Sequence, residues 1–466
     1  MRKKTLFHIN PIVLIFVLCL LTSPFCVLIP RAFSLSIEEE KTMGQDFLTQ
    51  IRKHCEFVND DFANQFINDL GIYLAKPVQP KHFPFHFYII KDNTLNAFAA
   101  PGGHTFFYSG LIDIMDTIDM LAGVMAHEIG HTAARHLAQR MEQNKKIGLA
   151  TMAGILAGAL IGGKAATALI TGSMAAGIQS QLHYSRTDER QADQLGLKFS
   201  TSAGFDPSGL TYALNNIEKE HFGTEEIPVY LLTHPNDSER MANLNAMASN
   251  YLPGLPKKEV ARFRSLFPIF KTVVRARCLD PLDAKNIFNN ELKKDREAFL
   301  PNLGLGIVYM RTLQYEQAIR HLKKAHKENP KFSPMMRYLG EAFQMHGENR
   351  EAILLFENAL KTNRYDKSTM FLLGLSYENI EEYEKAIHIF NALTSFDPVK
   401  NEVYYHLGIS YGRLNRLALA HYNFGLYFKK SGEVQTSKFH FRKASSLAGN
   451  NQGLKKKIHK AVKGLE

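Results

Sequence analysis

The sequence contains few cysteines. Of its four cysteines, two lie within the first 34 residues, which leaves only Cys55 and Cys278 in the rest of the chain. Two cysteines are too few for a fold held together by disulfides, although they leave a single bridge open. The composition also lacks the bias of a disordered chain or of a polytopic membrane protein, because 22% of the residues are charged and 45% are hydrophobic. A chain of 466 residues is too long for one core, so we expect two or three domains.

The first 34 residues contain no acidic residue and are predicted to be an export signal. A basic start, MRKK, precedes an apolar run over residues 12–28, and Ala32-Phe33-Ser34 provides the small residues of a cleavage site. The apolar run is long for a signal peptide, so an uncleaved membrane anchor is the alternative.

The net charge of +11 is distributed unevenly along the chain. Residues 1–34 carry +4, residues 35–256 carry −8, and residues 257–466 carry +15, with 36 lysines and arginines against 21 acids. A basic half can bind nucleic acid, an anionic membrane or an acidic neighbour. Because the preceding segment is acidic, we expect the basic half to dock onto it. A merely solvated basic face is the alternative, and nucleic acid is disfavoured.

An apolar stretch over residues 121–140 carries two histidines and a carboxylate in the pattern H-E-x-x-H. His127 and His131 are four residues apart, so on a helix they project from successive turns of one face and can share a tetrahedral zinc. Glu128 can take the proton of a metal-bound water as that water attacks a peptide carbonyl. A five-residue pattern also occurs by chance, so the remaining ligands are needed to support the prediction.

A third ligand distinguishes the classes of zinc peptidase. Metzincins require a glycine and a histidine where this chain has Ala134 and Leu137, which excludes that class. A glutamate from a later helix is the other option, and Glu189 and Asp193 are again four residues apart. Glu189 can ligate zinc, and Asp193 can accept the second N–H of a ligating histidine. A solvated, charged helix start is the alternative interpretation of this segment.

Two strand-like segments surround a Pro-Gly-Gly turn upstream of the H-E-x-x-H helix. Together with residues 85–90, the segments 97–99 and 105–108 predict a small sheet beside that helix. An edge strand there can pair with an extended peptide and hold its scissile bond over the zinc. An ordinary hairpin is the alternative. We select Asn96 as the polar residue for contact with the substrate backbone.

Residues 147–181, between the zinc motifs, contain one charged residue, Lys164. Each uncharged half has about the minimum length of a membrane span, but its glycines and alanines also suit close helix packing. We expect an apolar helical pair near the active site, in contact with the membrane or an unfolded substrate. An integral membrane hairpin is the alternative.

The C-terminal half contains a repeat with a period of 34 residues. A Leu-Gly pair is followed, twelve residues after the glycine, by alanine, and four residues later by a large apolar residue. The four copies begin at Leu305-Gly306, Leu339-Gly340, Leu373-Gly374 and Leu407-Gly408. This is the tetratricopeptide pattern, which predicts a helical solenoid with a concave binding face. Phe288 indicates a degenerate unit upstream, and Gly425 with Phe441 indicates a further helix pair at the end.

Four motifs occur in an order that resembles the HtpX/Oma-type zinc metallopeptidase family: NAFAAPGGHTFFYSGLID, AHEIGHTAARH, YSRTDERQAD and LLTHPNDSERMANL. With the repeats, the chain is similar to the BepA-like members of that family, the β-barrel assembly-enhancing proteases. The resemblance implies one Zn²⁺ per chain, held by His127, His131 and Glu189, with Glu128 as general base and Asp193 behind a ligating histidine.

The resemblance extends to residues further along the chain. It implies that His234 can take the fourth zinc position and hold the enzyme latent. It also implies that Arg240 lies near the substrate or the transition-state oxygen. Gln191 departs from the family pattern, where relatives often have glutamate.

These observations predict a mainly α protein with a small β-sheet. We expect a signal peptide (1–34), an α+β gluzincin metalloprotease domain (35–256) and an all-α tetratricopeptide solenoid (257–466). The resemblance implies a zinc endopeptidase in the periplasm of a Gram-negative-type envelope, acting in quality control or assembly of outer-membrane proteins. Its partners would be unfolded or stalled envelope proteins and the β-barrel assembly machinery, with peripheral membrane contact and no nucleic acid. A chaperone or scaffold with a largely latent zinc site is the alternative function.

Overall fold

The computed structural model describes residues 35–143, 184–221, 227–251 and 257–463. The predicted export signal and the apolar segment 147–181 lie outside the described residues. Within the described parts, none of the helices combines the length and the apolar composition that a membrane span requires.

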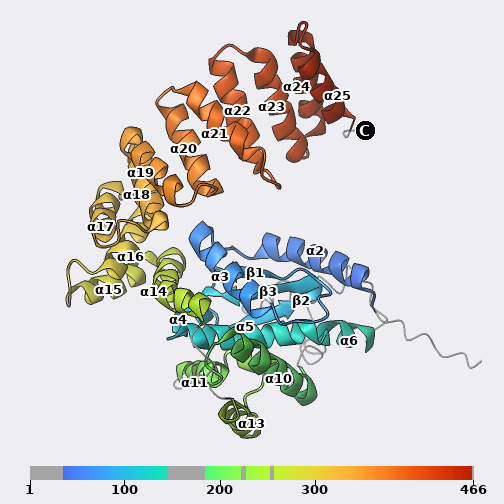
Figure 1. Ribbon diagram of the computed structural model, residues 1–466, viewed down its shortest axis with the longest axis vertical. Helices are drawn as coiled ribbons and strands as arrows, with labels where there is room; N and C mark the ends of the chain where they lie inside the picture. Colours follow the sequence, from blue (N-terminus) through green and yellow to red (C-terminus); the bar gives the residue numbers. More distant parts are fainter. Residues whose placement is uncertain (1–34, 144–183, 222–226, 252–256, 464–466) are drawn as a thin grey trace, which may run out of the picture.

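A three-stranded sheet lies at the centre of the N-terminal part (Figure 1). Its strands are β1 (His86–Ile90), β2 (Ala97–Ala100) and β3 (His104–Tyr108), in the order β1-β3-β2. β3 is parallel to β1 and antiparallel to β2, so β2 is an edge strand. The turn η1 (Pro101–Gly103) needs glycine, because Gly102 and Gly103 both have positive φ. The predicted small sheet is therefore confirmed.

Helices cover both faces of this sheet. Alternate residues of a strand point to opposite faces, so Phe98 and Phe106 pack with α2 (Ile37–His54), whereas Ala97 and Phe107 belong to the core that contains α5 (Ile118–Ala133). The other described helices of this part are α3 (Asp61–Leu74), α4 (Ser109–Ile114), α6 (His136–Gln143), α10 (Arg186–Ala203), α11 (Gly209–His221), α12 (Val229–Thr233) and α13 (Ser238–Ser249).

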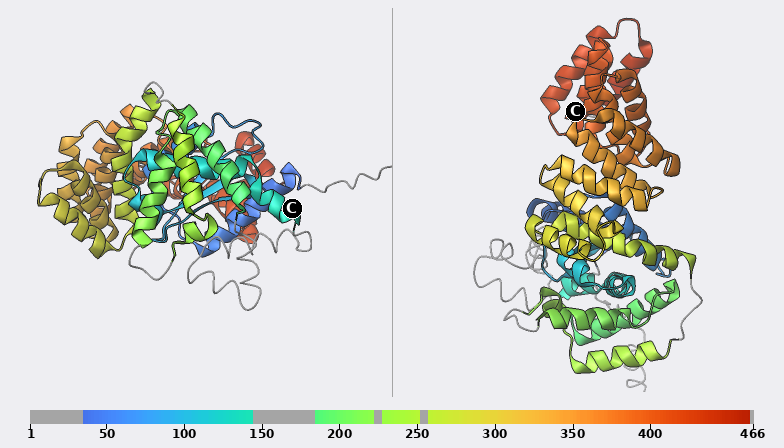
Figure 2. Two further views of the ribbon diagram at one scale, coloured as in Figure 1. Left: turned by 90° about the horizontal axis from the view of Figure 1, so that it is seen from below. Right: turned by 90° about the vertical axis from the view of Figure 1, so that its left-hand side faces the viewer.

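The C-terminal part is a series of paired helices that extends away from the sheet (Figure 2, right). It comprises α14 (Lys258–Cys278), α15 (Pro281–Leu292), α16 (Phe299–Arg311), α17 (Tyr315–Glu328), α18 (Ser333–His346), α19 (Asn349–Thr362), α20 (Lys367–Asn379), α21 (Tyr383–Leu393), α22 (Asn401–Arg413), α23 (Leu417–Lys430), α24 (Val434–Leu447) and α25 (Gln452–Val462). The predicted fold class, an α+β part followed by an all-α solenoid, is confirmed.

The repeat glycines lie where paired helices are closest. A Cβ atom on Gly340 or on Gly374 would stand 2.6 Å from the ring of Phe356 or Phe390, respectively. The glycine therefore makes room for the large apolar residue sixteen positions later, and the ring fills the space between the helices. Gly425 meets the ring of Phe441 at 2.6 Å in the same way, which confirms the further helix pair at the end of the array.

Helix α14 joins the two parts. Its Phe270 stacks on Phe66 of α3, with ring centroids 4.3 Å apart. Its basic residues form ion pairs with acids of the N-terminal part, at N···O distances of 2.7–3.3 Å: Arg262–Asp69, Arg264–Asp119, Arg275–Asp113 and Arg277–Asp60. The start of the basic half thus docks onto the acidic half, as predicted. The division of the chain at residue 257 stays a prediction, because α14 shares one apolar core with α3 and α5.

The two cysteines outside the predicted signal do not form a disulfide. Cys55 and Cys278 are both free thiols. Burial raises the pKa of each thiol to about 11, so neither is ionised near neutral pH.

Candidate metal centre

Helices α5 and α10 approach closely because glycines stand at their contact. A Cβ atom on Gly196 would lie 2.9 Å from the backbone of His127, and one on Gly130 would lie 2.7 Å from the carbonyl oxygen of Ala192. Ser185 caps the start of α10 in a capping box with Asp188, so regular helix begins just before Glu189. The close packing places Glu189 opposite the histidines of α5.

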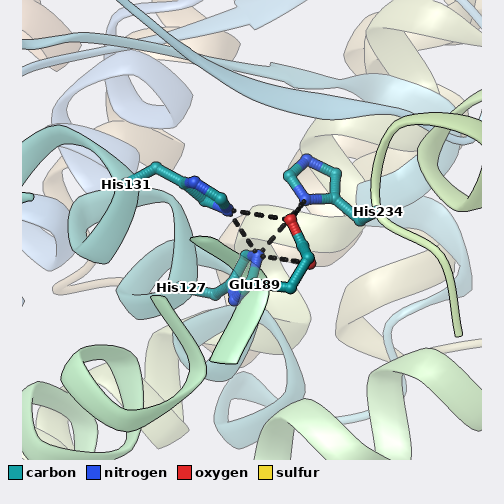
Figure 3. Close-up of side chains that lie close together, drawn as sticks. All are labelled: His127, His131, Glu189 and His234. Carbon is teal, nitrogen blue, oxygen red and sulfur yellow. Dashed lines mark hydrogen bonds and ion pairs between the residues drawn. The ribbon is translucent and has the colours of Figure 1, made fainter. Parts of the chain in front are cut away.

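The structure brings all four predicted ligands together in the interior (Figure 3). His127 and His131 come from α5, Glu189 comes from α10, and His234 follows α12. Each offers one ligand atom, and these atoms all lie within 4.8 Å of one another. The four side chains are at most 5% exposed. Such a convergence of buried donors, from three separate segments, is a candidate metal site.

The spacing of the donors fits a tetrahedral zinc. Zinc–ligand bonds of 2.0–2.1 Å in a tetrahedron place the ligand atoms roughly 3.3 Å apart. Nε2 of His127 lies 3.0 Å from Nε2 of His131 and 3.3 Å from Nδ1 of His234. The Glu189 carboxylate lies 2.9–3.6 Å from the three histidine nitrogens. Three nitrogens and one carboxylate are also the donor set that zinc prefers.

Asp193 directs the His127 ring toward the other donors. Its Oδ1 lies 2.9 Å from Nδ1 of His127. The hydrogen bonds from His127 and Arg240 outweigh the effect of burial and lower the pKa of Asp193, so it is a carboxylate. Nδ1 of His127 therefore carries the proton, and the lone pair of Nε2 faces the other donors.

A second chain of hydrogen bonds orients His131. Nδ1 of His131 lies 3.0 Å from Nδ1 of His136, whose Nε2 lies 3.0 Å from Oε1 of Gln191. The amide oxygen of Gln191 can only accept, so Nε2 of His136 donates and its Nδ1 accepts from His131. His131 thus also turns an unprotonated Nε2 inward. Two lone pairs only 3.0 Å apart repel each other unless a cation lies between them.

The fourth donor, His234, is held by aromatic rings. Its ring stacks on Tyr230 of α12 at a centroid distance of 4.7 Å and on Tyr184 at 5.1 Å. The backbone N–H of Tyr230 donates to the carbonyl oxygen of Leu95, just before β2, so α12 lies beside the edge of the sheet. His234 is fully buried, and its ring nitrogen is the fourth donor atom of the candidate metal site.

Glu128 lies beside the four donors and is completely buried. Its carboxylate is 3.6 Å from Nε2 of His234, and the backbone N–H of Ala99 in β2 is close enough to lower its pKa. Burial raises the pKa of Glu128, and His234 and His127 offset that effect only in part. Glu189 behaves differently, because His234 and His131 outweigh burial and hold its pKa well below the ordinary value. Glu128 is therefore suited to accept a proton, and Glu189 is suited to remain charged as a ligand.

The contacts of Arg240 and Asn96 are with other residues of the protein. The guanidinium of Arg240 forms two hydrogen bonds with Asp193, at 2.8 and 2.9 Å, and lies 2.7 Å from Glu189. Arg240 thus holds the carboxylates in place. Asn96 is 1% exposed, and its side chain forms a hydrogen bond with the side chain of Tyr108. The roles of both residues toward substrate stay predictions.

Sequence reasoning missed the residues that surround the ligands. Tyr184 packs on His131 at a centroid distance of 3.8 Å, and the guanidinium of Arg140 lies over its ring, 4.4 Å from the centroid. His136 and Gln191 complete the support of His131. Tyr184 and Gln191 flank Glu189 within YSRTDERQAD, so their proximity to that ligand was a signal. No such signal pointed to His136, because its role depends on the turn between α5 and α6.

Comparison with known proteins agrees with this geometry. Residues 45–248 match peptidase family M48, and residues 368–400 match the tetratricopeptide repeat. The M48 match spans all four donors, Glu128 and Asp193. The tetratricopeptide match spans α20 and α21, one helix pair of the solenoid.

The matches to curated relatives cover only part of each relative's length. The β-barrel assembly-enhancing protease of Escherichia coli is 33% identical over 223 residues, which are 47% of this chain and 46% of the relative. A Vibrio cholerae relative of the same description is 31% identical over 302 residues, 64% of this chain and 62% of the relative. Metalloprotease LoiP of E. coli is 26% identical over 226 residues, 46% of this chain and 82% of LoiP. The chain thus spans less than two thirds of the two assembly-enhancing relatives.

Proposed function

This chain carries a peptidase family M48 domain and tetratricopeptide repeats, and from that premise we propose that it is a zinc-dependent endopeptidase of the cell envelope. One observation carries the proposal. Three buried ligands, His127, His131 and Glu189, converge beside a buried carboxylate, Glu128, that also touches the edge strand of a sheet. A peptide added to that edge would run past both the ligands and the base.

In the proposed reaction each residue has a distinct task. One zinc ion per chain would polarise the scissile carbonyl and lower the pKa of the attacking water. Glu128 accepts the proton of that water and passes it to the leaving amine. Asp193 keeps His127 in its ligating tautomer, and Arg240 holds Asp193 and Glu189 in position. Asn96 is proposed to meet the substrate backbone after a local rearrangement.

Location and clients are proposed from the sequence and from the relatives. The signal-like residues 1–34 support export to the periplasm of a Gram-negative-type envelope, with an uncleaved anchor as the alternative. The name of the E. coli relative supports a role in β-barrel assembly. We propose that the protease domain spans 35–256 and that the solenoid (257–466) binds unfolded or stalled envelope proteins, or their assembly machinery. Peripheral membrane contact is assigned to residues 147–181, and no role in nucleic-acid binding is proposed.

A second function, as a chaperone or scaffold with a latent site, is favoured by the position of His234. Its Nδ1 lies 2.9 Å from Glu189, where it would exclude a water from the fourth position. The latent and active forms would alternate as the segment with His234 docks and leaves.

The first test measures zinc content and cleavage together. The purified wild type should hold about one zinc per chain, and Glu189→Gln should lose most of it. Glu239→Gln is the matched control, because Glu239 is an exposed carboxylate that pairs with Arg190 on the surface. A folded wild type that holds no zinc after reloading would contradict the proposal.

Cleavage of labelled β-casein then separates the two functions. Glu128→Gln should keep its zinc and lose cleavage by at least about a hundredfold. His234→Ala should raise cleavage if His234 blocks the site, and lower it if His234 stabilises the transition state. Persistent cleavage by Glu128→Gln would show that the assignment of the base is wrong.

A further inference from the structure

The last helices of the solenoid enclose a cleft with a volume of about 730 Å³. It lies between α21, α22, α23 and the C-terminal helix α25, at the end of the molecule farthest from the sheet (Figure 2, right). Helix α25 is fixed in place by a small core that includes Leu454 and Ile458. A hydrogen bond of 2.6 Å from Lys429 to the carbonyl oxygen of Ala461 also holds it. The packing of α25 against the preceding helices therefore defines the cleft.

The charge of this end differs from that of the rest of the solenoid. Residues 401–466 contain twelve lysines and arginines against three glutamates, so they hold +9 of the +15 of the C-terminal half. Four arginines of α14 form ion pairs with acids of the N-terminal part. By contrast, no lysine of α25 forms an ion pair with any carboxylate among the described residues.

The lining of the cleft combines cations with tyrosines and amides. Lys457 and Lys460 line it from α25, and their spacing places both on one face of that helix. Tyr404, Tyr411 and Tyr422 line the opposite walls and are partly exposed. The amide groups of Asn391 and Asn423 also line it, and Asn391 donates to the hydroxyl of Tyr411 at 3.2 Å.

We propose that this cleft binds an extended, acidic segment of another polypeptide. The lining contains no aspartate or glutamate. The lysines attract carboxylates, the tyrosines bury side chains, and the asparagine amides can bond a peptide backbone. Several lysines on one helix suit several carboxylates, whereas a single chain terminus would offer only one.

A peptide fits this cleft better than the other anionic partners. A membrane surface is broad and would contact the exposed lysines without entering the cleft. The tyrosines are arranged around a hollow, which suits an inserted chain. The inference rests on the proposed role of the solenoid in client binding, but it does not depend on the zinc chemistry.

The test measures binding of a fluorescein-labelled peptide, (Glu-Ser-Leu)₄, to the full chain by fluorescence anisotropy. The Glu128→Gln variant is used so that the probe is not cleaved. We expect binding at least about tenfold tighter than that of (Gln-Ser-Leu)₄, and weaker as salt rises. Equal binding of the two peptides would overturn the proposal.

Two charge-reversal variants locate the site. Lys457→Glu/Lys460→Glu should weaken binding of the acidic peptide at least about tenfold, because both cations of the cleft are reversed. The matched control, Lys456→Glu/Lys463→Glu, makes the same change in net charge within α25 and at its C-cap, outside the cleft lining. It should weaken binding less than about threefold. Equal losses in the two variants would overturn the proposal, and circular dichroism checks that both remain folded.

Other outcomes point to other occupants. Binding of phosphatidylglycerol vesicles without binding of the peptide would assign this end to the membrane and overturn the proposal. Salt-sensitive dimers that Lys457→Glu/Lys460→Glu abolishes, again without peptide binding, would assign it to the acidic half of a second copy. If the peptide does not bind but wild type cleaves β-casein, only the cleft proposal fails. If the peptide binds and nothing is cleaved, only the protease proposal fails.

Discussion

Two clusters of buried ionisable groups in this molecule contrast in how they are neutralised. The metal cluster consists of His127, His131, Glu189 and His234. The junction cluster consists of Asp60 at the start of α3, Arg277 of α14, and Arg337 and Tyr338 of α18. Asp60 accepts hydrogen bonds from Tyr338 at 2.8 Å and from Arg277 at 3.1 Å, and it lies 4.0 Å from Arg337.

The junction cluster contains its own counter-charges, whereas the metal cluster does not. Two arginines surround the single carboxylate of Asp60. At the metal cluster, Arg240 forms ion pairs with Glu189 and Asp193, and the buried carboxylate of Glu128 pairs with no lysine or arginine among the described residues. A buried charge needs compensation, so the junction cluster is complete as a docking contact, whereas the metal cluster is suited to an added cation. The difference separates a structural ionic cluster from a functional one.

The largest effect is expected at the junction. Asp60→Asn leaves two buried arginines without their carboxylate and should lower the free energy of unfolding by about 3 kcal/mol. Urea denaturation at pH 7 measures the change. Zinc content should not change, because the junction cluster is separate from the donors.

The pH dependence of this effect follows from the pKa of Asp60. Burial alone would raise that pKa, but Arg277 and Arg337 outweigh burial and lower it. The stabilisation is therefore present above the unfolded pKa, near 4, and is lost as the pH falls below it. The difference between wild type and Asp60→Asn should shrink below about pH 4. Asp61→Asn is the control, since Asp61 is half exposed, and a comparable loss there would contradict the comparison.

An intermediate effect on stability and zinc binding is expected at the contact between α5 and α10. Gly196→Ala inserts a methyl group 2.9 Å from the backbone of His127 and should destabilise the protein by about 2 kcal/mol. It should also weaken zinc binding, because it separates Glu189 from the histidines. Competition with a chromophoric chelator measures the affinity. Gly412→Ala is the control, since its new Cβ atom meets only Ala420 at 3.8 Å, and it should leave both properties intact.

The smallest effect is expected on zinc binding, from changes to Gln191, which supports His131 through His136. Gln191→Ala removes the acceptor that orients His136 and should weaken zinc binding about tenfold. Gln191→Glu keeps an acceptor at that position and should bind zinc nearly as well as wild type. Gln194→Ala changes an exposed glutamine one turn further along α10 and serves as the control. An equal loss in Gln191→Ala and Gln194→Ala would refute the orienting role of Gln191.

Local patterns predicted much of the fold and the membership of the site. The 34-residue period specified the helix pairs, because each repeat glycine has to face a large side chain in its own unit. The four-residue spacings placed His127 with His131, and Glu189 with Asp193, on common helix faces. Spacing could not predict His136, Tyr184 and Tyr230 as supports of the donors, because they come from different segments and meet only when α5, α10 and α12 pack.

Sequence alone determined which residues can ligate a metal, which half carries which charge, and where the repeats lie, because these properties depend on residue type and short-range spacing. Tertiary structure decided how the charges are used. Folding paired the basic residues of α14 with the acidic half and left the lysines of α25 around an open cleft. It also placed Arg240 on the carboxylates of Glu189 and Asp193, and His234 beside the other three candidate donors. These contacts join residues far apart in the chain, and only packing of the helices fixes such distances.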